Sequence, residues 1–362
     1  MTSSDLITTL FRREVLSLAP YKVADAAGLI KLDAMENPYH WPEPVVRAWL
    51  ERLRSSELNR YPDPEARTLN ATIRQTYDIP EQFDILLGNG SDEIIQLLLM
   101  ALPAEASILA PDPGFVMYRQ IGRSLGLEYQ PVALRPADFG LDLPAMLETI
   151  DRHRPSIIFL AYPNNPTGNL FEAQAVQEII QAAHGLVVID EAYEPFAKTS
   201  FIDRLGSHDN LLIMRTLSKL GLAGLRLGYI VGSPDVIGQL NKIRLPYNIN
   251  ILTQITADFA LQNSALFGEQ TQAICNERTR VYNALNQFEE ITAFPSAANF
   301  ILFRTADRQA TPIFEALKEH GVLIKNLDPQ GGLLKDCLRT TIGTPDENRL
   351  FLEALSNCLR TR

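Results

Sequence analysis

The chain has 362 residues, of which 46% are hydrophobic and 21% charged, and its formal net charge is −10. This length predicts a large core that divides into two domains, and a negative charge without any dense run of lysine or arginine argues against a nucleic-acid-binding surface. The N-terminus lacks the cationic and apolar parts of a signal peptide, and the apolar run 94–102 is too short to cross a bilayer.

The middle of the chain alternates short apolar runs with helical patterns such as 172–183. None of the apolar runs alternates strictly between apolar and polar residues, which is typical of strands covered by helices on both faces of a mostly parallel sheet. The run 228–231 follows Lys219 so closely that a crossover helix barely fits, and this strand is therefore expected to be antiparallel. The predicted strands are 85–87, 107–110, 157–161, 186–189, 211–214 and 228–231.

The pattern of predicted secondary structure changes after about residue 250, where predicted strands become fewer and helical patterns longer. We predict a three-part organisation: an N-terminal segment, 1–54, packed on the small domain; a large α/β domain, 55–252; and a small C-terminal α+β domain, 253–362. The patterns behind the last part are helices at 253–288, 312–320 and 345–359, and apolar runs at 299–303, 321–324 and 337–343.

The cysteines and histidines predict no metal centre and no disulfide framework. Cys275, Cys337 and Cys358 are scattered and odd in number, and the five histidines show no metal-site spacing. We therefore expect free thiols in a protein of the reducing cytoplasm.

Two charged side chains follow predicted buried strands. Lys219 ends the run 211–218, where burial would lower the pKa of its amine and favour Schiff-base formation and proton transfer. Asp190 follows the run 186–189, where a carboxylate is costly to bury unless it is paired. An amine and a buried acid suit pyridoxal 5′-phosphate (PLP), whose pyridinium N–H would pair with the acid. The alternatives are a surface lysine and an aspartate exposed just beyond its strand.

Two uncharged polar residues lie at the same predicted sheet edge. Asn165 lies in the turn Tyr162–Gly168, where two prolines fix its amide at the carboxyl end of a strand, the usual place for ligands in α/β sheets. An ordinary turn is the alternative. Tyr193 could donate to the phenolate oxygen of the cofactor, or it could be a core tyrosine.

Three further features suggest anion binding. The segment Gly88–Glu93 joins a strand to a helix, so the N–H groups of Gly90, Ser91 and Asp92 could form a phosphate cup; taken alone, the pattern favours an ordinary helix cap at Ser91. Arg226 offers a phosphate-binding fork seven positions after Lys219. Arg339 lies inside an apolar run and needs an anion, for which a substrate acid is a better candidate than a structural salt bridge.

In this order, the motifs resemble the fold-type I PLP-dependent aminotransferases over nearly the whole chain, and among them the histidinol-phosphate aminotransferase family. The resemblance implies an α/β large domain with a mostly parallel seven-stranded sheet between helices, and a smaller α+β domain. It also implies transamination of L-histidinol phosphate with 2-oxoglutarate, which gives imidazole acetol phosphate and glutamate in histidine biosynthesis. The matching stretches are Leu32–Tyr39, Arg60–Pro64, Gly88–Glu93, Pro113–Tyr118, Asn164–Gly168, Asp190–Tyr193, Arg215–Lys219, Ala223–Gly228 and Cys337–Arg339.

Position by position, the resemblance implies that Lys219 forms the Schiff base and Asp190 pairs with the pyridine nitrogen. It implies that Asn165 and Tyr193 bind the hydroxyl of the cofactor ring and that Tyr118 stacks on this ring. The residues implied to hold the cofactor phosphate are Ser91, Asp92, Ser218 and Arg226. The resemblance implies that Tyr61 reaches the cofactor phosphate of a partner subunit. It thus implies a homodimer whose sites contain residues of both subunits. The residues at substrate-contacting positions are Tyr21, Asn89, Tyr247, Lys325 and Arg339.

Three positions depart from the family pattern. Met35 stands where asparagine is common, and the interval from Lys219 to Arg226 is one residue shorter than in many members. Lys325 stands where some members have a second phosphate-binding arginine, and a lysine is a point charge rather than a bidentate fork. This last change concerns the substrate rather than the chemistry.

Other functions on the same scaffold stay open at this stage. An aromatic amino-acid aminotransferase, or a PLP-dependent decarboxylase of amino-acid phosphates, would use the same lysine and aspartate. A PLP-binding transcription regulator would need a DNA-binding module, for which the chain has no room before residue 20 and no basic patch.

Overall fold

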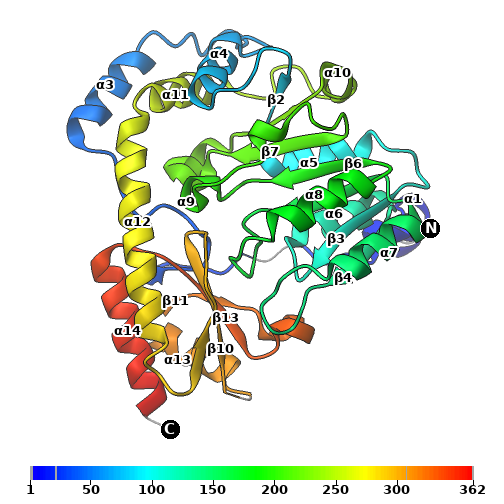
Figure 1. Ribbon diagram of the computed structural model, residues 1–362. Coiled ribbons are helices and arrows are strands. Elements are labelled where there is room, and N and C mark those ends of the chain that lie inside the picture. Colours follow the sequence, from blue (N-terminus) through cyan, green and yellow to red (C-terminus); the bar gives the residue numbers. More distant parts are fainter. Residues whose placement is uncertain (1–2, 21–22, 307, 361–362) are drawn as a thin grey trace.

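The computed structural model describes residues 3–20, 23–306 and 308–360. Figure 1 shows a large part built around a central sheet and a smaller part below it, built around a second sheet. The long helix α12 (Ser264–Leu285) runs alongside both parts.

The central sheet has seven strands in the order β2-β8-β7-β6-β5-β3-β4. Strand β8 is antiparallel to both of its neighbours, as predicted, and the other pairs are parallel. The strands are β2 (Asp84–Gly88), β3 (Ser107–Asp112), β4 (Glu128–Ala133), β5 (Ile157–Ala161), β6 (Leu186–Asp190), β7 (Leu211–Thr216) and β8 (Gly228–Gly232). The six predicted strands and the α/β class are thus confirmed, while β4 was missed because this edge strand is partly exposed and contains a proline, which edge strands tolerate.

Both faces of the central sheet are covered by apolar side chains. Successive side chains of a strand point to opposite faces, so Ile158 packs in one cluster with α7 and α8 while Phe159 packs in another with α5 and α6. A strand buried in this way must be apolar at every position, which explains the missing alternation in the sequence. The covering helices are α5 (Ser91–Met100), α6 (Val116–Leu125), α7 (Leu143–His153), α8 (Ala173–Ala182) and α10 (Pro234–Asn241).

The smaller part contains a four-stranded antiparallel sheet in the order β12-β13-β10-β9. Its apolar side packs against α12, α13 and α14, which together enclose a separate core. The elements are β9 (Ile291–Ala293), β10 (Phe300–Thr305), β12 (Lys325–Asn326), β13 (Cys337–Thr341), α13 (Ala310–Glu319) and α14 (Pro345–Arg360).

The predicted long helix 253–288 is two helices, α11 (Ile251–Gln262) and α12, which meet at Asn263. Ala257, Ala260 and Leu261 of α11 pack in a cluster with β2 and β8 of the large part. The core contacts therefore place the domain boundary inside α12 rather than at residue 253.

The N-terminal segment contacts both parts rather than the small one alone. Strand β1 (Ile30–Lys31) pairs parallel with β11 (Val322–Leu323) of the small part. By contrast, α3 (Glu43–Leu53) packs on α11, which in turn packs on α4 (Arg67–Thr76), and α2 (Arg13–Leu16) packs on α6.

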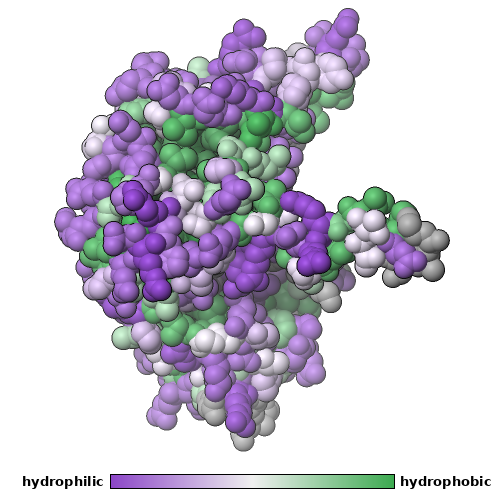
Figure 2. Space-filling view, turned by 90° about the vertical axis from the view of Figure 1, so that its right-hand side faces the viewer, coloured by the Kyte–Doolittle hydropathy of each residue, from purple (hydrophilic) through white to green (hydrophobic). Residues whose placement is uncertain are grey.

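Helix α1 (Ser3–Leu10) exposes apolar side chains, among them Leu6, Ile7 and Leu10. Figure 2 shows an arm that projects from one side of the molecule and carries both apolar and polar residues. Among the described residues, no helix has the length and apolar character needed to cross a bilayer. The three cysteines are buried.

Candidate active site

A pocket opens at the carboxyl ends of β5, β6 and β7. Neighbouring parallel strands bring the residues that follow them to one edge of the sheet, where ligands usually bind in α/β folds. Segments that are far apart in the sequence meet here. Eight of the predicted residues line the pocket: Ser91, Asp92, Asn165, Asp190, Tyr193, Ser218, Lys219 and Arg226.

Asp190 is the last residue of β6, and its carboxylate is buried. Its Oδ2 accepts a hydrogen bond of 2.6 Å from the Tyr118 hydroxyl, and its Oδ1 accepts one of 3.1 Å from the Ala192 N–H. Burial nevertheless raises the pKa of Asp190 to about 6. A buried carboxylate with a raised pKa beside a pocket is suited to a cationic N–H partner.

The structure corrects the role expected for Tyr118. This residue is buried behind Asp190, and its ring stacks on Phe159 in the core at a centroid distance of 4.5 Å. It is Phe115, at the start of α6, that lines the pocket. Both aromatics lie in one short motif, and one turn of helix separates the side chain that faces the pocket from the one that supports Asp190.

Lys219 follows β7 in the turn Ser218–Leu222, where the backbone is kinked at Gly221, with φ +122°. Its ammonium Nζ donates a hydrogen bond of 3.2 Å to the Ala34 carbonyl and lies 5.7 Å from the centre of the Tyr193 ring. Burial, and then the charge of Arg339, lower the pKa of Lys219 to about 8. About a tenth of such amines are neutral at pH 7, far more than for an exposed lysine.

Asn165, Tyr193 and Arg339 form a hydrogen-bonded chain across the site. The Asn165 amide donates to the Tyr193 hydroxyl over 3.0 Å and accepts from Arg339 Nη1 over 2.6 Å. Arg339 also donates to the Asp33 carbonyl over 3.1 Å, and it is 94% buried. The arginine predicted to bind a substrate anion is thus held against the amide predicted to bind the cofactor.

One end of the pocket is formed by the start of α5. The helix cap is Gly90, with φ +84°, and no side chain caps the helix, so its first N–H groups are available as donors. Arg226 Nη2 donates to Asp92 Oδ2 over 3.3 Å. A Cβ at Gly90 would lie 2.7 Å from Arg226 Nη2, so only glycine leaves room for this approach.

The position of the helix cap also distinguishes the two interpretations of the segment Gly88–Glu93, a phosphate cup and an ordinary helix cap at Ser91. Ser91 is the first residue of α5 rather than its cap, contrary to the simple capping alternative. Because the Asp92 carboxylate pairs with Arg226, Asp92 can serve a phosphate through its backbone N–H and by orienting Arg226, not through its side chain.

A buried ion pair supports the turn after Asp190. Arg215 of β7 donates through Nε and Nη2 to Glu191 Oε2, over 2.9 and 2.8 Å. Glu191 also accepts from the N–H of Phe201. Removing one partner of such a pair leaves a buried charge, which typically costs about 3–5 kcal/mol. The pair therefore fixes the backbone on which Asp190 and Tyr193 lie.

Besides Tyr118 and Arg339, described above, four predicted residues do not line this chain's pocket: Tyr61, Asn89, Tyr247 and Lys325. Another, Tyr21, lies outside the described residues. Tyr61 is 80% exposed and stacks on Tyr247 at a centroid distance of 4.5 Å. Asn89 is exposed, and its N–H donates to Glu93. Lys325 lies opposite Arg339 in the β12–β13 pair.

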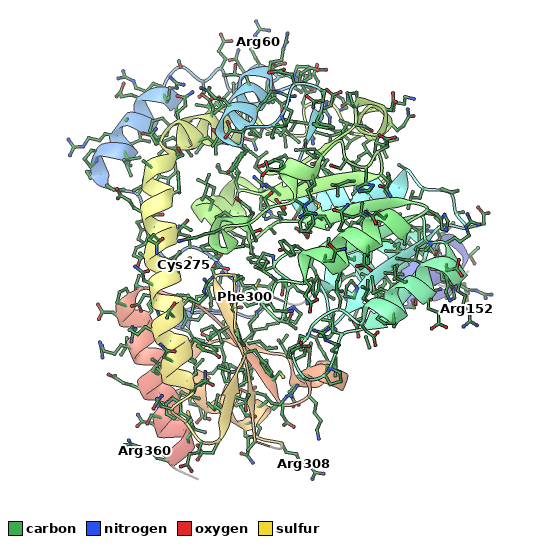
Figure 3. All side chains as sticks on the ribbon, viewed as in Figure 1. Arg60, Arg152, Cys275, Phe300, Arg308 and Arg360 are labelled. Carbon is green, nitrogen blue, oxygen red and sulfur yellow. The ribbon has the colours of Figure 1, made fainter. Side chains whose placement is uncertain are left out.

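Two site residues had no predicted role. Met35 lines the pocket, and Phe300, labelled in Figure 3 where β10 approaches the large part, packs edge-on against Tyr193 at 5.1 Å. The Arg339 guanidinium lies 5.2 Å from the centre of the Phe300 ring. An isolated phenylalanine in an apolar strand carries no sequence signal of such a position.

Comparisons with known proteins agree over almost the full length. A family model described as aminotransferase class I and II matches residues 27–355. The histidinol-phosphate aminotransferase 2 of Nitrosococcus oceani is 57% identical over 354 residues, which cover 98% of each chain. The histidinol-phosphate aminotransferase 1 of Ralstonia nicotianae is 48% identical, with 98% of this chain and 96% of the relative covered.

Among solved structures, the histidinol-phosphate aminotransferase of Sinorhizobium meliloti in complex with pyridoxal 5′-phosphate superposes with a TM-score of 0.87. The two sequences are 25% identical, and the match covers 98% of both chains. The likeness therefore includes both the large and the small part of the fold.

Proposed function

The chain belongs to the class I and II aminotransferase family, and on that premise we propose that it transaminates L-histidinol phosphate with 2-oxoglutarate. The products are imidazole acetol phosphate and glutamate, in histidine biosynthesis. One observation carries the chemistry: a half-buried lysine with a lowered pKa, Lys219, shares a pocket with a buried carboxylate, Asp190, and an uncapped helix N-terminus.

The residues of this pocket fit PLP. The first N–H groups of α5, with Ser218 and Arg226, form a cationic, donor-rich end for the phosphate. Asp190 offers a carboxylate for the protonated ring nitrogen, and Asn165 and Tyr193 offer donors for the ring hydroxyl. When bound, the cofactor supplies an electron sink for the carbon from which a proton is removed.

Within this arrangement the protein's own groups bind, orient and move protons. Lys219 holds the cofactor and, as a free amine, carries the proton between the two reacting carbons, for which a pKa of about 8 is well suited. Asp190 keeps the ring nitrogen protonated, and Phe115 covers the pocket wall. Tyr193 and Asn165 fix the ring hydroxyl.

Substrate recognition is assigned to the cations of the small part. Arg339 offers a guanidinium fork, and Lys325 lies opposite it on the neighbouring strand. Burial, and then the charge of Arg339, lower the pKa of Lys325, as expected for two cations that share one small region. A dianionic phosphate benefits from both charges more than a carboxylate does. The hydrogen bond from Arg339 to Asn165 then exchanges with one to the substrate.

The test is a single-turnover measurement of the first half-reaction with histidinol phosphate, phenylalanine and tyrosine. We expect kcat/KM to be clearly highest for histidinol phosphate. A protein that reacts faster with phenylalanine would be an aromatic amino-acid aminotransferase. Release of carbon dioxide from an amino-acid phosphate would indicate the decarboxylase alternative instead.

Replacing Lys325 with alanine should reduce kcat/KM for histidinol phosphate more than for phenylalanine, by about tenfold, because one of two charges on the phosphate is lost. The control is Lys318→Ala, which removes a lysine paired with Glu315 on the outer face of α13. Equal losses for the two substrates would assign Lys325 to the surface rather than to the site.

We further propose a homodimer in which Tyr61 completes the partner's site. The support is that Tyr61 and Tyr247 stack on the surface and not in their own pocket, beside the exposed apolar Leu58 and Leu245. Arg60, next to Tyr61, is labelled at the top of Figure 3, far from the small part. Exposed aromatic and apolar side chains of this kind are typical of protein interfaces.

Mixing Tyr61→Phe protein with Lys219→Ala protein should raise the activity above that of either, because subunit exchange creates one site that carries neither change. The measurement is the specific activity before and after exchange. The matched control mixes Lys219→Ala protein with Asp190→Asn protein. Each of these residues lies in the pocket of its own chain, so every site of a mixed dimer carries one of the two changes and exchange restores no site. An active monomer in ultracentrifugation would contradict the proposal.

A further inference from the structure

Met35 touches the hydroxyl that the proposed function assigns to the cofactor. The Tyr193 hydroxyl donates to the Met35 sulfur over 3.2 Å, and it accepts from the Asn165 amide over 3.0 Å. Met35 lines the same pocket as Lys219. A hydroxyl has one proton to donate, so the residue that accepts it competes with any ligand for that donor.

The position of Met35 is fixed by its backbone rather than by its side chain. Its N–H donates to Thr341 Oγ1 over 2.9 Å, and its carbonyl accepts from the Asn299 amide over 3.0 Å. Its φ is +55°, in the left-handed region that side-chain-bearing residues seldom adopt. Contacts to the small part therefore hold residue 35 in place and direct its side chain to Tyr193 of the large part.

The acceptor is a weak one. A thioether sulfur accepts hydrogen bonds poorly, whereas a negatively charged ring oxygen forms a charge-assisted bond about twice as strong as a neutral one. The Tyr193 proton can thus leave the sulfur at little cost. An amide oxygen of similar reach would hold the proton more firmly. Tyr193 is 96% buried, so water offers it no alternative acceptor.

We propose that Met35 is a positioning residue that contacts the Tyr193 hydroxyl without retaining its proton, so that the hydroxyl is free to donate to the ring oxygen of the cofactor. This inference rests on the proposed function and adds a role for a residue at which the chain departs from the family pattern. It makes residue 35 a determinant of how strongly Tyr193 stabilises negative charge on that oxygen.

The test follows the visible absorption band of the PLP-loaded protein as a function of pH. A donor to the ring oxygen favours the deprotonated form of the chromophore, because that form has more negative charge on the oxygen. Met35→Gln offers a strong acceptor on a side chain of similar length. It should therefore raise the pH at the midpoint of the absorption change by about one unit. Met35→Leu, which offers no acceptor, should leave the midpoint where it is.

The same two substitutions in a Tyr193→Phe background form the matched control. Without the hydroxyl, Met35→Gln and Met35→Leu should give the same midpoint. An equal rise for Met35→Gln in both backgrounds, or a rise for Met35→Leu like that of Tyr193→Phe, would overturn the role of Met35. Lack of any visible band in the unchanged protein with PLP would overturn the proposed function as well. Thermal unfolding of the cofactor-free variants checks that each one folds, and we expect their unfolding temperatures to agree.

Discussion

Replacing Lys219 with alanine should lower kcat by about four orders of magnitude, because the proton carrier and the attachment point of the cofactor are lost together. The amine lies in the pocket with a pKa of about 8, lowered chiefly by burial. The described residues that line the pocket include no second lysine that could take over this role.

The measurement combines single-turnover kinetics with borohydride reduction and peptide mapping. The unchanged protein should carry the reduced pyridoxyl group on Lys219, and the variant should carry none. Lys198→Ala is the control, since that lysine bonds to Gln272 on α12 away from the pocket. A reduced pyridoxyl group mapped to any other lysine would refute the assignment.

The second large effect is expected for Asp190→Asn, which should bind the cofactor but lower kcat by about two to three orders of magnitude. An amide can donate its N–H to an unprotonated ring nitrogen and does not stabilise the positive charge of a protonated one, so a charge-assisted contact in a buried site is lost. The amide can still accept from Tyr118, which keeps the geometry comparable. Near-normal turnover of the variant would count against Asp190 as the ring partner.

The same substitution should stabilise the cofactor-free protein above pH 6. Folding raises the pKa of Asp190 from 3.8 to about 6, so the ionised carboxylate costs the folded state about 3 kcal/mol at pH 8. This cost is absent below the unfolded pKa, develops as the pH rises from the unfolded to the folded pKa, and is complete above the folded pKa. The stability advantage of Asp190→Asn over the unchanged protein should therefore shrink between pH 7 and pH 4, as measured by urea unfolding.

Much of the large domain could be predicted because its strands are buried on both faces. Runs such as 157–161 are apolar at every position, and polar residues follow them where each strand ends. Parallel strands bring those ends together, so Asn165, Asp190 and Lys219 could be expected in one pocket without knowledge of the tertiary structure.

What sequence patterns could not give is the direction of individual side chains. Phe115 and Tyr118 are three residues apart in one motif, and only the register of α6 decides which of them faces the pocket. The contact between Met35 and Tyr193 depends on a left-handed backbone at residue 35 and on packing between the two parts. Strand β4 lacked an apolar run because it lies at the sheet edge.

The strand order has a consequence for the newly made chain on the ribosome. Strand β2 lies at one edge of the sheet and pairs with β8, which is translated long after it. Until β8 emerges, the N–H and C=O groups of β2 and β7 have no partner on that side, and such exposed edges promote aggregation. The start of α5 likewise gains its hydrogen bond with Arg226 only later in translation, and Asn165 gains its hydrogen bond with Arg339 near the end. The residues assigned to the cofactor are therefore complete once Arg226 has left the ribosome, whereas Arg339, assigned to the substrate, follows near the end of translation.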